Sequence, residues 1–317
     1  MSKYKVAANM EWTSKCNARC VMCPQSLIQK PQLMTQDTFS KTLDRLKDED
    51  LFRVVIAGYG EPTTHPRFMD FMSAIGEHPV RFDLVSNGQE LNEQKLLHMD
   101  GKIDLLVISF SSIDRSVYER VHVNLDHDRV KENIRLAQKT FKHTQLGISL
   151  TPLPECLDTL PETIEWLKSL GIKLLTMSPT LYDRGGSMTD HKLSTERLRQ
   201  MIAKYQLHSQ EMDFIPSIGD TLQQLWKNKF KCMPRNSDIF ISSSGDYLYC
   251  YNDISHKHTM GHVNDQSVRE ALMRRENMAS VDGLCNGCNM RDRYQPQELI
   301  HVAGKYLSNK LIGRFAS

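Results

Sequence analysis

Short apolar runs alternate with amphipathic segments through the first 178 residues of this 317-residue chain. Six of the runs have the length and branched apolar content of β-strands, at residues 5–12, 52–57, 80–85, 104–110, 146–150 and 173–178. The segments between them carry apolar side chains at helical spacing, at residues 36–47, 67–77, 92–99, 128–142 and 160–170. Gly171 follows the last segment, where a glycine commonly ends a helix. Six such units predict an α/β fold with a parallel sheet and right-handed crossovers, either doubly wound or curled into a partial (βα)6 TIM-like barrel.

The alternation fades beyond residue 178. Runs at residues 238–242 and 247–251 flank the sequence Ser-Ser-Gly-Asp and predict a β-hairpin. Helical segments are predicted at residues 194–209 and 267–276, and the weakly amphipathic tail at 298–315 is predicted to pack on the body. We therefore expect four parts: a barrel core at residues 1–190, a helical linker at 191–230, a cysteine-rich module at 231–295 and a C-terminal helix at 296–317.

Charge and hydropathy narrow the classes of partner. The formal net charge of +2 favours neither nucleic acid nor an anionic membrane as a partner. No stretch of 18 consecutive apolar residues occurs, and the first residues do not read as a secretory signal peptide. We expect a soluble cytoplasmic protein. Thiols stay reduced in that compartment, so the eight cysteines favour metal ligation over disulfides.

Seven of the eight cysteines form two groups with the spacing of metal ligands. The first has C-x3-C-x2-C spacing in the loop after the first predicted strand: Cys16, Cys20 and Cys23. The second lies in the predicted module: Cys232, Cys250, Cys285 and Cys288. Three thiolates leave one iron of a four-iron cluster open to a further ligand, whereas four thiolates close a cluster. Zinc is the alternative for both groups, and at the first it would need a fourth ligand such as His65.

Polar and glycine-rich segments end the next three predicted strands. Pro24 follows the third cysteine, Gly-Tyr-Gly-Glu-Pro occupies residues 58–62, and Ser-Asn-Gly occupies residues 86–88. Together these segments resemble those of the radical S-adenosylmethionine (radical SAM) enzymes, over about residues 5–185. The sequence Phe-Ser-Ser at residues 110–112 departs from that family's apolar-Asp-Gly. The resemblance implies cofactor contacts from Met22, Gly60, Glu61, Ser86, Asn87, Ser109 and Ser111.

The same resemblance implies a chemistry. The open iron of a 4Fe–4S cluster would be chelated by S-adenosylmethionine, which an electron from the cluster cleaves to methionine and a 5′-deoxyadenosyl radical that abstracts hydrogen from a substrate. A reductant of the flavodoxin or ferredoxin type is implied as partner.

The cysteine-rich module resembles the SPASM/twitch modules of that family. The hairpin at residues 239–250, the Met-Gly-His-Val-Asn segment at 260–264 and the final cysteine pair carry this likeness. Because only four cysteines are present, the module resembles the shorter twitch form, which implies a second 4Fe–4S cluster with all irons ligated.

Three further residues are candidates for directing the reaction. Cys156 follows the fifth predicted strand and would donate a hydrogen atom to a substrate radical, or else is a buried cysteine without function. Glu155 is a candidate substrate contact or general base. Arg184 follows the sixth strand and is a candidate for holding a substrate carboxylate or hydroxyl, or for a structural salt bridge.

Three hypotheses for function follow from these residues. The first is a dehydrogenase that passes an electron to the second cluster. The second is a redox-neutral epimerase that uses Cys156, with a peptide-modifying maturase as a related possibility. The third is a metal-stabilised binding or electron-carrier protein without catalysis. The first strand begins almost at the amino terminus, without the leader-binding domain of many peptide-modifying relatives, and this favours a small metabolite or sugar as substrate.

Overall fold

The computed structural model describes residues 6–47, 51–151, 153–178, 195–209, 238–278 and 281–285. Within these residues, nine strands form one sheet in the order β6-β5-β4-β3-β2-β1-β7-β8-β9. The first six pair in parallel with their neighbours in sequence. They are β1 (Val6–Met10), β2 (Leu51–Ile56), β3 (Phe82–Ser86), β4 (Leu105–Ser109), β5 (Gln145–Leu150) and β6 (Leu174–Met177).

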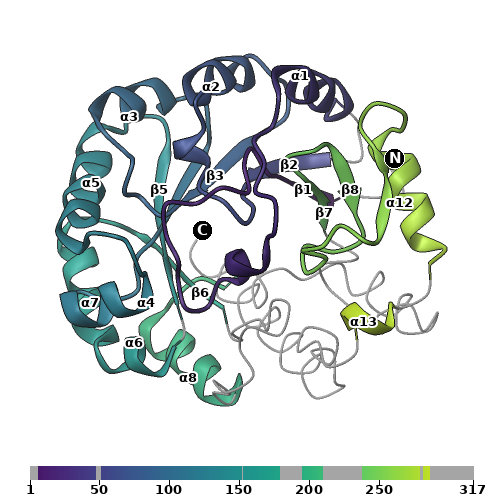
Figure 1. Cartoon of the computed structure of the whole chain (residues 1–317). Coiled ribbons are helices and arrows are strands. Elements are labelled where there is room, and N and C mark those ends of the chain that lie inside the picture. The colour runs from purple at the N-terminus through teal and green to yellow at the C-terminus, as the bar shows by residue number, and fades with distance from the viewer. Residues whose placement is uncertain are drawn as a thin grey trace, which may run out of the picture.

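The helices lie in an arc around the outside of this curved sheet, and the loop after β1 lies inside the arc (Figure 1). With helices on its outer face, the sheet is a partial TIM-like barrel, one of the two parallel arrangements that the sequence predicted. The helices of this part are α1 (Gln36–Arg45), α2 (Phe68–Gly76), α3 (Glu93–Met99), α4 (Arg115–Val121), α5 (His127–Thr140), α6 (Pro154–Asp158), α7 (Leu160–Ser169) and α8 (Thr195–Tyr205). Short 3-10 turns, η1 (Pro24–Leu27) and η2 (Pro62–Thr64), lie in the loops after β1 and β2.

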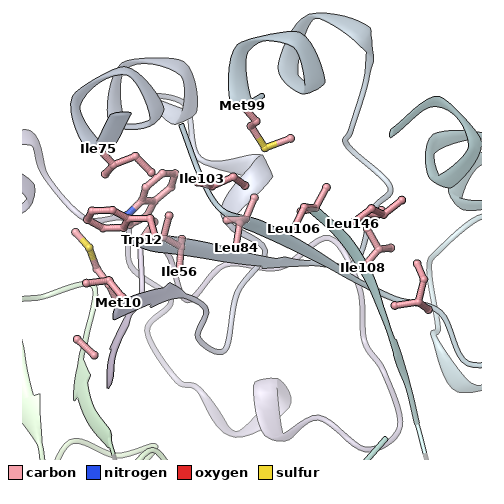
Figure 2. Packing of buried hydrophobic residues seen from close by; sticks show 14 of the residues in the cluster. Met10, Trp12, Ile56, Ile75, Leu84, Met99, Ile103, Leu106, Ile108 and Leu146 are labelled. Atoms are coloured by element: carbon pink, nitrogen blue, oxygen red, sulfur yellow. The ribbon is translucent and has the colours of Figure 1, made fainter. Parts of the chain in front are cut away.

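The main core fills the space between the sheet and these helices. Figure 2 shows Ile56, Leu84 and Leu106 of the strands facing Ile75 and Met99 of the helices. At one end of this layer the Trp12 ring contacts three phenylalanine rings edge-on, with centroids 5.4–6.0 Å apart: Phe39, Phe68 and Phe71. Burial of this apolar surface drives the folding of the barrel and fixes the end of β1, from which the cysteine loop departs.

All six strands predicted for the first half occur, with ends that differ by at most two residues. The helices α4 and α6, of seven and five residues, were not predicted. Asp114 is the residue type that commonly begins a helix. As the N-cap of α4, its side chain accepts a hydrogen bond from the Val117 N–H at 2.9 Å.

The predicted hairpin is confirmed and continues the barrel sheet. Strand β7 (Asp238–Ile241) pairs in parallel with β1, and β8 (Asp246–Leu248) and β9 (Thr259–His262) follow as antiparallel strands. Gly245 has a φ of +93° in the turn between β7 and β8, which a glycine adopts without strain. Helix α12 (Val268–Glu276) is joined to β7 by its buried Arg275, whose Nη1 donates to the Asp238 carbonyl at 2.6 Å.

The short helix α13 (Asp282–Cys285) ends the described residues. The predicted helix at 298–315 lies outside them. No helix in the described ranges has the length and apolar character that crossing a lipid bilayer requires.

Candidate cofactor site

Backbone hydrogen bonds hold the cysteine loop against the end of α4 and the residues that follow it. The Arg19 N–H donates to the Val123 carbonyl at 2.9 Å, and the Val21 N–H donates to the Val121 carbonyl at 3.0 Å. These two bonds bracket Cys20 on one segment. On the other they bracket His122, whose Nδ1 lies 3.4 Å from the Cys20 sulfur.

The three thiols of this loop are half-buried and close enough to affect one another's ionisation. Burial, and to a smaller extent the neighbouring thiols Cys23 and Cys16, raises the pKa of Cys20 to about 12. Burial likewise raises the pKa of Cys16 to about 11, although the Ala18 N–H, 3.4 Å from its sulfur, opposes this. Thiols with a pKa this high lose their protons near neutral pH only when they bind a metal, as at iron–sulfur sites.

The donor set fits a polynuclear cluster with an open iron. Among the described residues, no three His, Cys, Asp or Glu side chains are close enough to hold one metal ion. A cubane cluster does not require such a group, because its irons take thiolates at separate corners. His65, the suggested fourth zinc ligand, uses both ring nitrogens elsewhere: Nε2 lies 3.1 Å from the Met34 carbonyl oxygen, and Nδ1 accepts from the Arg67 N–H at 3.1 Å.

The Gly-Tyr-Gly-Glu-Pro loop after β2 lies directly against the cysteine loop. A Cβ atom at Gly60 would overlap with the carbonyl oxygens of Thr13 and Lys15, so only glycine allows this approach. The next N–H, that of Glu61, donates to the Lys15 carbonyl at 2.9 Å. The Gly-Tyr-Gly-Glu-Pro loop, which is predicted to contact the cofactor, therefore packs against the segment that leads into Cys16.

The Glu61 carboxylate joins the loops after β2 and β3 and is 3% exposed. Its Oε1 accepts from the Thr63 N–H (3.1 Å), the Thr63 hydroxyl (2.6 Å) and the Ser86 hydroxyl (2.8 Å), while Oε2 accepts from the Asn87 N–H (2.7 Å). Burial raises its pKa, and these hydrogen bonds oppose the rise. The contact of Glu61 with the cofactor, which the resemblance implied, remains a prediction.

Two asparagines connect the loop after β3 to the cysteine loop. The Asn87 amide donates to Asn17 Oδ1 at 2.7 Å. Asn17 Nδ2 is buried and makes no hydrogen bond within the described part of the chain. An unsatisfied buried donor beside Cys16 is costly unless a ligand acceptor completes it. The unsatisfied Asn17 amide is therefore suited to donate a hydrogen bond to a carboxylate or hydroxyl group of a cofactor.

The two serines after β4 that are predicted to contact the cofactor differ in their burial. Ser109 ends β4 and is half-buried. Ser111 is buried, and its Oγ lies 2.8 Å from His122 Nε2 and 2.7 Å from the Thr151 hydroxyl. Sequence reasoning did not find His122, because no motif marks it and its partner Cys20 is 102 residues away.

Cys156 lies in α6 and is 1% exposed. It forms a small apolar cluster with Val121 and Leu153, and Met22 of the cysteine loop packs against that cluster. Burial raises the pKa of Cys156 to about 12, so the side chain is a neutral thiol. The structure thus brings Cys156 and Met22 together. Glu155 is half-buried beside Cys156, and Arg184 lies outside the described residues.

Two cysteines of the second group are described, and both pack partly buried against the main core. Cys250 follows β8, and its sulfur accepts from the Asn252 N–H at 3.5 Å. Cys285 ends α13. Cys232 and Cys288 lie outside the described residues, so closure of the second group remains a prediction.

Glu11 is a further buried carboxylate that the sequence did not single out. It follows β1 and is 1% exposed. Its Oε1 accepts from the Tyr59 N–H at 2.9 Å, and its Oε2 accepts from the Ser243 N–H (3.2 Å) and hydroxyl (2.9 Å). Glu11 therefore ties the loop after β2 to the turn between β7 and β8.

Comparison with known proteins agrees with this site. The family model described as the radical SAM superfamily matches residues 10–167. A tungsten-containing aldehyde ferredoxin oxidoreductase cofactor-modifying protein of Pyrococcus furiosus is 28% identical over 54% of this chain and 51% of its own length. An S-adenosylmethionine-dependent nucleotide dehydratase of a Thermoplasmatales archaeon is 30% identical over 43% of this chain and 49% of its own. The chain spans about half the length of these curated relatives.

Solved structures share the fold at low sequence identity. Streptococcus suis SuiB bound to precursor peptide SuiA superposes with a TM-score of 0.69 and 14% identity, over 90% of this chain and 70% of that chain. BtrN in complex with AdoMet and 2-DOIA superposes with a TM-score of 0.55 and 17% identity, over 91% and 94% of the two chains. At these identities the likeness concerns the fold.

Proposed function

Since the chain belongs to the radical SAM superfamily, we propose that it binds S-adenosylmethionine at a 4Fe–4S cluster held by Cys16, Cys20 and Cys23, and dehydrogenates a small metabolite or sugar. When bound, this pair supplies a 5′-deoxyadenosyl radical that removes a hydrogen atom from substrate carbon. The chain's part is to hold and orient. The three thiols leave one iron open, and the buried Asn17 amide offers a free donor beside them.

The observation that carries the oxidation is the pairing of β7 with β1. The strand that leads to Cys250 is hydrogen-bonded, through its hairpin, to the strand that leads to Cys16. A carbinol that has lost a hydrogen atom becomes a ketone by losing one electron and one proton. We propose that the second cluster, at Cys232, Cys250, Cys285 and Cys288, takes the electron and that Glu155 is a candidate to take the proton.

Small-molecule chemistry and an external reductant complete the proposal. The fold likeness to BtrN, which was solved with 2-DOIA and which this chain spans almost fully, supports a small substrate. Lys15, Arg19 and Lys30 are exposed on the cysteine loop, and their positive charge suits an acidic reductant of the flavodoxin or ferredoxin type. Arg184 is proposed to hold a polar group of the substrate.

The test uses the anaerobically reconstituted protein with S-adenosylmethionine, dithionite and a panel of sugars and cyclitols deuterated at their carbinol carbons. We expect deuterium in 5′-deoxyadenosine and a product that has lost one deuterium and one hydrogen from the labelled substrate. The Cys250→Ser variant should still form 5′-deoxyadenosine but no ketone. Ketone formation by Cys250→Ser at the wild-type rate contradicts the second cluster as the electron acceptor, and a wild-type protein that never forms 5′-deoxyadenosine is not catalytic in this way.

Epimerisation is the second candidate, because the Cys156 thiol is neutral and belongs to the small apolar cluster against which Met22 of the cysteine loop packs. Cys156 is 1% exposed and thus separated from solvent, and this favours oxidation over epimerisation. An epimerase would take deuterium from heavy water into a product of unchanged composition, and Cys156→Ala would abolish it. Full product yield from Cys156→Ala removes this candidate.

A further inference from the structure

His122 is a buried histidine wedged between a cluster cysteine and a hydroxyl pair. Its side chain is 1% exposed, with Nδ1 at 3.4 Å from the Cys20 sulfur and Nε2 at 2.8 Å from the Ser111 oxygen. The contact with Cys20 is built by the backbone, since the bonds of Arg19 and Val21 to Val123 and Val121 set the two residues opposite each other.

Once Cys20 ligates iron, the number of available hydrogens decides which atom is the donor in each of these hydrogen bonds. A ligating thiolate has no proton and can only accept, so a hydrogen bond requires that Nδ1 carry the hydrogen, whether the ring is neutral or cationic. In the neutral ring Nε2 then has no hydrogen and accepts a hydrogen bond. The Ser111 hydroxyl must therefore be the donor. In the structure the Ser111 hydroxyl donates to Thr151 Oγ1 at 2.7 Å. Ser111 has one hydrogen, so once that hydrogen turns to Nε2, the Thr151 hydroxyl becomes the donor of this pair.

We propose that His122 is a positioning residue for the cluster: its Nδ1–H donates to the Cys20 thiolate, and Ser111 with Thr151 holds the ring in the tautomer that does so. An N–H group directed at a ligating sulfur stabilises the negative charge of the reduced cluster and raises its reduction potential. His122 thereby eases the one-electron reduction that starts the reaction. This inference rests on the cluster proposed at the first cysteine group and is independent of the reaction that follows.

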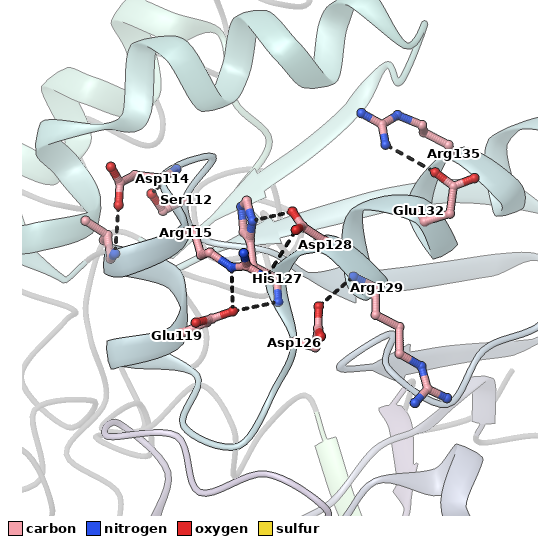
Figure 3. A network of polar contacts seen from close by, with 11 residues as sticks. Ser112, Asp114, Arg115, Glu119, Asp126, His127, Asp128, Arg129, Glu132 and Arg135 are labelled. Atoms are coloured by element: carbon pink, nitrogen blue, oxygen red, sulfur yellow. Dashed lines mark hydrogen bonds and ion pairs between the residues drawn. The ribbon is translucent and has the colours of Figure 1, made fainter.

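Helices α4 and α5 keep the ring in place. The His122 N–H donates to the Tyr118 carbonyl at 2.7 Å, and the Tyr118 ring lies 4.7 Å from the imidazole between centroids. Figure 3 shows the polar contacts of these two helices, in which the ion pair of Arg115 with Asp128 joins α4 to α5. Arg115 contacts Glu119 and Asp128, each at 3.1 Å, and Glu119 accepts from the N–H of the first residue of α5.

Two amide substitutions separate the two ring nitrogens. In His122→Asn the side-chain amide reaches the position of Nδ1 and can still donate to Cys20. In His122→Gln it reaches the position of Nε2 and meets Ser111 instead. We expect the midpoint potential of the first cluster to stay near the wild-type value in His122→Asn and to become more negative in His122→Gln. The readout is an EPR-monitored redox titration of the reconstituted protein, following the signal that changes on addition of S-adenosylmethionine.

Iron content and a distant histidine provide the controls. His78→Asn changes a ring whose Nε2 lies at the Leu43 carbonyl, away from the site, and should leave the potential unchanged. Iron per chain reports whether the cluster forms, and the potential reports the hydrogen bond. Equal potentials in His122→Asn and His122→Gln, whether wild-type or shifted together, overturn the proposal. Loss of iron from both variants also overturns it, since the residue would then be needed for assembly and not for tuning.

Discussion

Single residues set how closely the loops around the candidate cluster approach one another. Gly60 is the clearest case, because a Cβ atom there would overlap with two backbone carbonyls of the chain leading into Cys16. We expect Gly60→Ala to lower the free energy of unfolding by about 1–3 kcal/mol through overpacking and to reduce iron incorporation. Chemical denaturation and iron per chain measure the two effects.

Gly76→Ala is the matched control for that substitution. At Gly76 the three nearest atoms are all side-chain carbons of Lys102, so an added methyl group would displace a side chain and not the backbone. Iron incorporation in Gly76→Ala should equal that of the wild type. If Gly60→Ala incorporates iron as well as Gly76→Ala does, the close approach of the two loops is not needed for the cluster.

His65 gives a prediction about pH. Burial lowers its pKa below the ordinary value of 6.5. As pH falls below 6.5 the unfolded chain therefore binds a proton here before the folded chain does, and the folded state loses stability. We expect His65→Gln to melt below the wild type at pH 7.5, and the difference in Tm to narrow towards pH 5.5. A difference that is constant or grows on acidification contradicts this account.

At the scale of elements, the structure rests on connections that join segments far apart in sequence. Glu11 is one of these, because it links β1 to Tyr59 and to Ser243. Glu11→Gln keeps one acceptor oxygen and replaces the other by a donor that faces the Ser243 N–H. We expect a loss of about 1–3 kcal/mol and faster amide hydrogen exchange in the turn between β7 and β8.

An exposed glutamate serves as the comparison for Glu11. Glu132 pairs with Arg135 on the surface of α5, where such pairs contribute little. Glu132→Gln should leave exchange in the turn between β7 and β8 unchanged. The role assigned to Glu11 fails if both variants exchange alike.

Most elements of the barrel were predictable because their signals are local. The strands show runs of apolar residues, and the N-caps Thr35 and Asn92 begin α1 and α3 where the helical pattern starts. The pairing of β7 with β1 had no local signal, because parallel pairing across about 230 residues depends on which sheet edge the folded barrel leaves open.

At the scale of the whole molecule, the two cysteine groups predict separable iron content. A chain with both clusters should bind about eight irons after anaerobic reconstitution, since each cluster holds four. Cys16→Ser and Cys250→Ser should each approach about four, with 5′-deoxyadenosine formation lost only in Cys16→Ser. Iron analysis with product chromatography measures this, and a wild-type chain with only about four irons contradicts a second cluster.

The sequence alone determined the class of fold and predicted the ligand chemistry. Thiol spacing, strand-end glycines and the alternation of strands with helices are local patterns, and they predicted the first cysteine group and the parallel barrel on which it sits. Only the tertiary structure decided what surrounds the thiols. Cys20 meets His122, Glu61 meets Asn87 and Glu11 meets Ser243 through contacts between distant segments. Such contacts follow from how the strands order and the loops pack, and no spacing along the chain encodes them.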